Sequence, residues 1–259
     1  MELKNLIDEK NEALYNRVAT HFPVQFELNE DWRADAWTSY IENNVAYIKY
    51  CEEEIEHPKA ALTHELLYLD LRIKGFKRIF TGISLNKKNQ SKIQTLVKCL
   101  DYEFRNHRIE ANYTALGYAA NQFYGDENEL SEDYFLDILN EESYSLMSIS
   151  ILYLNFITPF GGWSKIQKER IQEQFDAYQN GDFQTNFQKI NQIINEWKTS
   201  KGYDATSFFI DFCKNIGLNN TWISYEKTAV DLNETNFPSS GFFIENAFTL
   251  KDIQKFYNH

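Results

Sequence analysis

The sequence contains few of the residues that interrupt regular structure, with 10 glycines and 4 prolines among 259 positions. This scarcity argues against a loop-rich β architecture and favours long regular elements. Hydrophobic residues make up 43% of the chain and aromatic residues 16%, which is enough to build a large core in one or two domains. The same composition argues against intrinsic disorder.

Cysteine is also scarce, because Cys51, Cys99 and Cys213 are far apart and no C-x-x-C pair is present. This pattern disfavours a cysteine-based zinc site and favours free thiols in a reducing compartment. No run approaches the roughly 18 apolar residues of a membrane span. The first residues lack the apolar core and cleavage site of a signal peptide. We therefore expect a cytoplasmic protein without membrane contact.

Basic residues are fewer than acidic ones. The chain has 26 Lys and Arg against 38 Asp and Glu, which gives a net charge of -12. Nucleic-acid binding requires a basic footprint, so we expect no nucleic-acid partner. The acidic surplus suits solubility or a basic partner. Residues 72–98 are an exception with a local basic bias, which we interpret as a solvated loop and helix face. The common nucleotide-binding loops and the G-x-S-x-G serine-hydrolase elbow are absent.

One short stretch, Ala-Leu-Thr-His-Glu-Leu-Leu-Tyr at residues 61–68, carries a pattern with chemical meaning. His64 and Glu65 are adjacent, as in the H-E-x-x-H motif, but Tyr68 occupies the place of the second histidine. In that motif two histidines one helical turn apart hold zinc, and the glutamate acts as general base on the bound water. Positions i, i+1 and i+4 share one helix face, so these three side chains can converge. Tyr68 either binds zinc through its phenolate or fills the space as a hydrogen-bonding core residue.

A second histidine-bearing helix is expected further along the chain. His107 could supply another metal ligand, and Glu103, His107 and Glu110 fall on one helix face at i, i+4 and i+7. Two helices that offer His64, Glu65, His107 and one glutamate could hold a metal without Tyr68. Ordinary helix-surface charges explain the two glutamates equally well.

The segment before the H-E helix has strand character. Residues 37–43 and 45–51 are rich in aromatic and β-branched residues and flank Asn43-Asn44, which predicts a hairpin. Pro58 then suits a helix start. A hairpin followed directly by the H-E helix is the order found in zincin-like folds.

Apolar periodicity and turn residues predict the remaining elements. The expected helices cover 2–20, 90–124, 163–180, 183–198, 204–217 and 249–256, and residues 131–157 form one long helix or two short ones. Short strands are expected at 24–28, 221–225 and 242–245, and residues 76–89 are expected to be a loop. The apolar stripes of these helices indicate core packing. Pro159, Gly161 and Gly162 predict a boundary between a domain at 1–158 and a helical subdomain with a short β tail at 163–259.

Several short motifs resemble zincin-like, metallopeptidase-related bacterial proteins of uncharacterised function. The matching residues are His64, Glu65 and Leu66, then Asn106 and His107, then Leu116, Gly117 and Tyr118. The resemblance extends over residues 37–125. It implies an α+β, mainly helical fold with a small antiparallel sheet packed near the H-E helix.

The resemblance also implies a function. His64 and His107 would bind zinc, and the coordination shell would be completed by Tyr68, Glu103 or Glu110. Glu65 would activate a water molecule to hydrolyse a peptide or amide bond. The departure at Tyr68 leaves a second hypothesis, in which an inactive scaffold binds a peptide or protein partner. A third hypothesis does not use the resemblance. In it the chain is an all-helical interaction protein, and the adjacent His64 and Glu65 are a coincidence.

Overall fold

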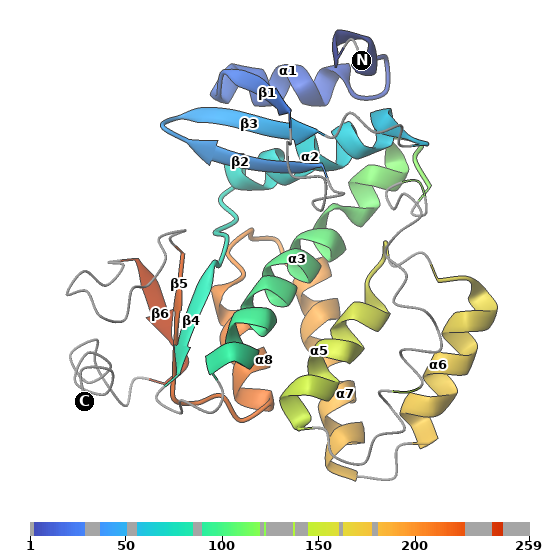
Figure 1. The fold of residues 1–259 in the computed structure, drawn as a ribbon, viewed down its shortest axis with the longest axis vertical. Helices are drawn as coiled ribbons and strands as arrows, with labels where there is room; N and C mark the ends of the chain where they lie inside the picture. Colours follow the sequence, from blue (N-terminus) through green and yellow to red (C-terminus); the bar gives the residue numbers. More distant parts are fainter. Residues whose placement is uncertain are drawn as a thin grey trace. The chain divides into compact units, whose positions relative to one another are not determined.

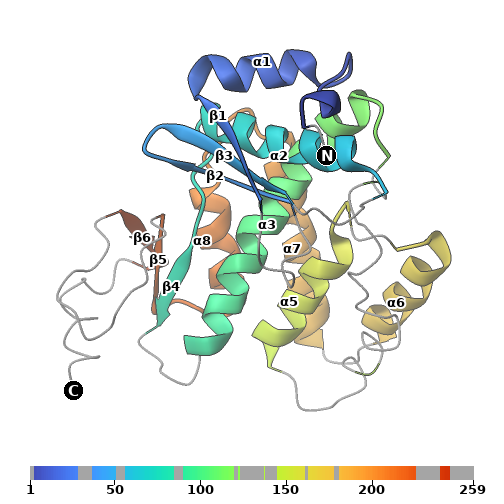
Figure 2. The same ribbon diagram turned by 45° about the horizontal axis from the view of Figure 1, so that its top comes forward.

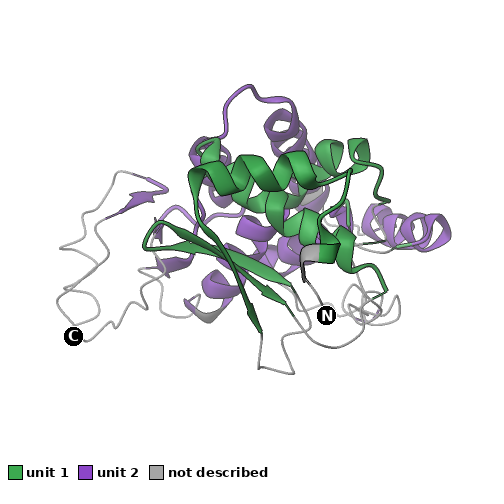
Figure 3. Cartoon of the chain, turned by 90° about the horizontal axis from the view of Figure 1, so that it is seen from above, with its two compact units in different colours: residues 1–76, 105–129, 159–163 green, residues 77–104, 130–158, 164–259 purple. Residues whose placement is uncertain are grey.

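A computed structural model of the chain shows a mixed α+β protein that is dominated by helices (Figure 1). It describes residues 3–28, 37–50, 56–84, 90–119, 122, 137, 145–160, 163–177, 181–225 and 240–245. The chain divides into two compact units (Figure 3). The first contains residues 1–76, 105–129 and 159–163, and the second contains residues 77–104, 130–158 and 164–259.

The two units interleave along the chain, because each is assembled from separate stretches. Helix α3 (Gln90–Ala115) contributes residues to both. The sequential boundary between residues 158 and 163 stays a prediction.

The first unit combines a three-stranded sheet with helices. Its elements begin with the 3-10 helix η1 (Leu3–Leu6), followed by α1 (Glu12–His21), β1 (Val24–Leu28), β2 (Thr38–Glu42), β3 (Val45–Tyr50) and α2 (Pro58–Ile73). The strand order is β1-β3-β2, and α2 packs against β2 and β3 while α1 packs against α2 (Figure 2).

This sheet is mixed, which corrects the expectation of an antiparallel sheet. β2 and β3 pair antiparallel as the predicted hairpin, but β1 pairs with β3 in parallel. Since β2 and β3 run in opposite directions, β1 runs opposite to β2 and in the same direction as β3. At the tip, Asn43 and Asn44 both have positive φ, 49° and 63°, the left-handed conformation that asparagine tolerates in a two-residue hairpin turn.

Helix α2 carries the His-Glu pair and begins and ends where the sequence indicates. Pro58 occupies its first turn, and Gly75 follows its end with φ of 102°. Every residue from Ala60 to Leu71 is buried. The helix therefore has no solvated face along this stretch, and its polar stripe lies in the interior.

The second unit contains the first part of α3 and most of the remaining helices. Its other elements are β4 (Thr81–Ser84), α5 (Leu146–Ile157), α6 (Lys165–Ala177), α7 (Gly181–Thr199), α8 (Thr206–Asn215), β5 (Thr221–Ser224) and β6 (Gly241–Phe243). The strands form an antiparallel sheet in the order β4-β5-β6. In the part of the chain that the structure describes, no helix is long and apolar enough to cross a membrane.

Aromatic side chains fill the helical core of this unit. Tyr153 of α5 contacts Phe175 of α6 and Phe187 of α7, with ring centroids 5.0 and 4.5 Å away. Trp197 donates a hydrogen bond from Nε1 to the carbonyl of Phe104 at 2.7 Å. These contacts confirm that the apolar stripes predicted for the helices are core.

Strand β4 is the element that the sequence analysis missed, because it lies inside the predicted loop at 76–89. Its four residues include Gly82 and are rich in small polar side chains, which hides the strand pattern. All four are nevertheless buried, and they pair with β5, about 140 positions later in the chain. The helix predicted at 249–256 lies outside the described residues.

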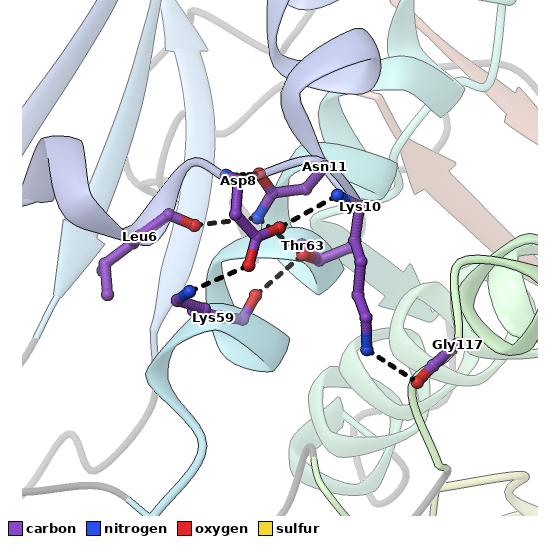
Figure 4. Close-up of polar contacts among 7 residues, drawn as sticks. All are labelled: Leu6, Asp8, Lys10, Asn11, Lys59, Thr63 and Gly117. Atoms are coloured by element: carbon purple, nitrogen blue, oxygen red, sulfur yellow. Dashed lines mark hydrogen bonds and ion pairs between the residues drawn. The ribbon is translucent and has the colours of Figure 1, made fainter.

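The N-terminal segment is tied to α2 by polar contacts (Figure 4). Asn11 is completely buried, and its Nδ2 donates to the carbonyl of Leu6 at 3.0 Å and to Thr63 Oγ1 at 3.1 Å. Lys59 of α2 forms an ion pair with Asp8 at 2.9 Å. The Asn11 side chain thus replaces water for two groups that burial removes from solvent.

Asp70 joins α1 to α2 through charge. Its side chain is 2% exposed and pairs with Arg17 of α1 at 2.6 Å and with Lys74, one turn along α2, at 2.7 Å. Arg17 remains half exposed, so water screens the outer side of the pair. The two cations offset the cost of burying the carboxylate.

We expect Asp70→Ala to lower the free energy of unfolding by about 1 kcal/mol, since it removes partly screened ion pairs. Replacing both Arg17 and Lys74 with alanine should cost about 3 kcal/mol, because it leaves a buried carboxylate without its cations. Urea unfolding of both variants measures the difference. Equal losses in the two variants would contradict the pairing.

Candidate functional site

His64 lies in the middle of α2 with an exposure of 0%. Both of its ring nitrogens are within hydrogen-bond distance of neighbouring side chains. Nδ1 is 3.2 Å from Glu65 Oε1, and Nε2 is 3.2 Å from Asn106 Oδ1. Glu65 is also buried, at 2%. The structure therefore brings the two residues of the predicted motif together in the interior.

Tyr68 completes this arrangement, one turn along the same helix. Its hydroxyl donates a hydrogen bond to Asn106 Oδ1, which His64 also contacts. The rings of His64 and Tyr68 meet edge to face with centroids 4.2 Å apart. Asn106, on α3, is completely buried. One amide thus connects the first and last positions of the H-E-x-x-Y stretch.

Which of the two ring nitrogens carries the proton depends on the tautomer of the imidazole. In either tautomer, each ring nitrogen of His64 faces the oxygen of a protein side chain.

Aromatic rings surround the imidazole on its remaining sides. Phe160 and Tyr113 both present edge-to-face contacts to His64, with centroids 5.3 and 6.1 Å away. The guanidinium of Arg105 lies 4.0 Å from the centre of the Tyr68 ring, in a cation–π contact. The apolar surroundings make an unpaired nitrogen on His64 costly.

The electrostatics of the site keep His64 neutral. Burial lowers the pKa of His64 below its usual value, and this effect outweighs the nearby Glu65, which raises that pKa. The positive charge of Arg105 lowers it further. Burial also raises the pKa of the Tyr113 phenol, so that this ring stays protonated.

The other predicted ligands lie along α3. His107 follows Asn106 and is 6% exposed, and Glu110 is half-buried one turn later. Glu103 is buried but belongs to the second unit, where its charge adds to burial in raising the pKa of the Cys99 thiol. No group of three or more His, Cys, Asp or Glu side chains suited to a metal ion occurs in the described segments. The zinc site therefore stays a prediction, without support from the described residues.

Sequence reasoning did not assign roles to Asn106, Arg105 and Phe160, although all three contact the His-Glu-Tyr stretch. One feature of the sequence was available for Asn106. It lies seven residues before Tyr113 on the same helix, so the two side chains share one helix face. Phe160 comes from a distant stretch of chain, and no local pattern indicates its position.

Comparisons of the chain with protein-family models, with curated proteins and with solved structures gave no match. The zincin-like resemblance therefore rests on the short sequence motifs alone.

We expect Tyr68→Phe to lower the free energy of unfolding by about 1 kcal/mol, because it removes the hydrogen bond to Asn106 in a buried setting. Tyr47→Phe is the matched control. Tyr47 is half-buried on β3, where it stacks on Tyr40, and no hydrogen bond of its hydroxyl occurs among the described residues. Urea unfolding compares the two, and equal stability of the Tyr68→Phe variant and the wild type would contradict the bond.

The lowered pKa of His64 predicts a stability loss in mild acid. The unfolded chain binds a proton at this histidine near pH 6.5, whereas the folded chain binds it only at lower pH, so unfolding becomes easier as pH falls below about 6.5. The loss is at most about 1.4 kcal/mol per pH unit for one group. The measurement is denaturant unfolding between about pH 5 and 8, the range in which a histidine changes its charge. The free energy of unfolding should depend less on pH in His64→Gln than in the wild type. His21→Gln, at an exposed position of α1, is the control.

Proposed function

We propose that this protein is a non-catalytic, metallopeptidase-like scaffold that acts by binding a peptide or protein partner. The observation that carries the proposal is the use of both ring nitrogens of His64 by Glu65 and Asn106 inside the first unit. A zinc ligand needs one nitrogen free to face the metal. Metal binding here would have to break one of these contacts within a fully buried site.

Tyr68 supports the same proposal. The phenol in the place of the second histidine donates to Asn106, and this is a structural role that needs no metal. An unperturbed tyrosine phenol loses its proton only near pH ~10, so it is a reluctant ligand at neutral pH. The polar stripe of α2 then acts as a paired polar core that fixes α2 against the Asn106 stretch of α3.

A zinc-dependent peptidase or related hydrolase is the second candidate. In its favour, the predicted order of a hairpin followed by the His-Glu helix is present as β2, β3 and α2. Glu65 would act as general base, and His64 would bind the metal together with His107 or a carboxylate.

Elemental mass spectrometry of protein purified without chelator or histidine tag separates the two candidates. We expect less than stoichiometric zinc before and after zinc addition, and a melting temperature that neither zinc nor EDTA changes. His64→Ala should melt lower than the wild type to the same extent with and without zinc, because it removes the contacts that Glu65 and Asn106 make to the imidazole in the core.

Near-stoichiometric zinc in the wild type that disappears in His64→Ala would overturn the proposal in favour of the hydrolase. Peptidase assays with Glu65→Gln would then follow, since loss of activity with retained zinc identifies the general base.

A further inference from the structure

We draw no further inference here: the strongest candidate, the stacked pair of Tyr40 and Tyr47 on the three-stranded sheet of the first unit, carries none, because Lys49 already lies over the Tyr40 ring and nothing in the described part of the structure shows what covers the other ring.

Discussion

Polar groups that leave water must find partners, and this constraint governs helix α2. Twelve consecutive residues of the helix are buried, and Thr63, His64, Glu65 and Asp70 are among them. Each meets a partner from another part of the first unit or from the helix itself. Asn11 bonds Thr63, Asn106 contacts His64, and Arg17 pairs with Asp70. The N-terminal segment, α1 and the later part of α3 are thus tied to one helix by polar contacts as well as by apolar packing.

The same constraint shapes the interpretation of the His-Glu pair. A histidine in a buried site costs stability unless both nitrogens are satisfied, and in this chain two protein side chains satisfy them. Tyr68 then adds a hydroxyl that the same amide accepts. A sequence pattern associated with metal chemistry can therefore also be the pattern of a well-paired polar core, and the local spacing of residues is identical in the two cases.

The second unit applies the constraint at a sheet edge. An uncovered strand edge presents unpaired peptide groups, and here side-chain amides from a helix take the place of a fourth strand. This solution differs from the usual protection by charged or proline residues, because the strand itself carries neither.

The sequence by itself determined the elements whose signals are local. The hairpin at Asn43-Asn44, the start of α2 at Pro58 and its end before Gly75, and the amphipathic helices of the second unit follow from turn chemistry and periodicity within a few residues. The convergence of His64, Glu65 and Tyr68 also follows, because helical spacing alone places them on one face. Tertiary structure decided the rest. β4 exists because β5, far along the chain, pairs with it, and β1 pairs with β3 in parallel, a direction that no local pattern indicates. Asn106 contacts His64 from α3, and Phe160 comes from a distant stretch. Such choices depend on contacts between residues far apart in sequence, about which local spacing carries no information.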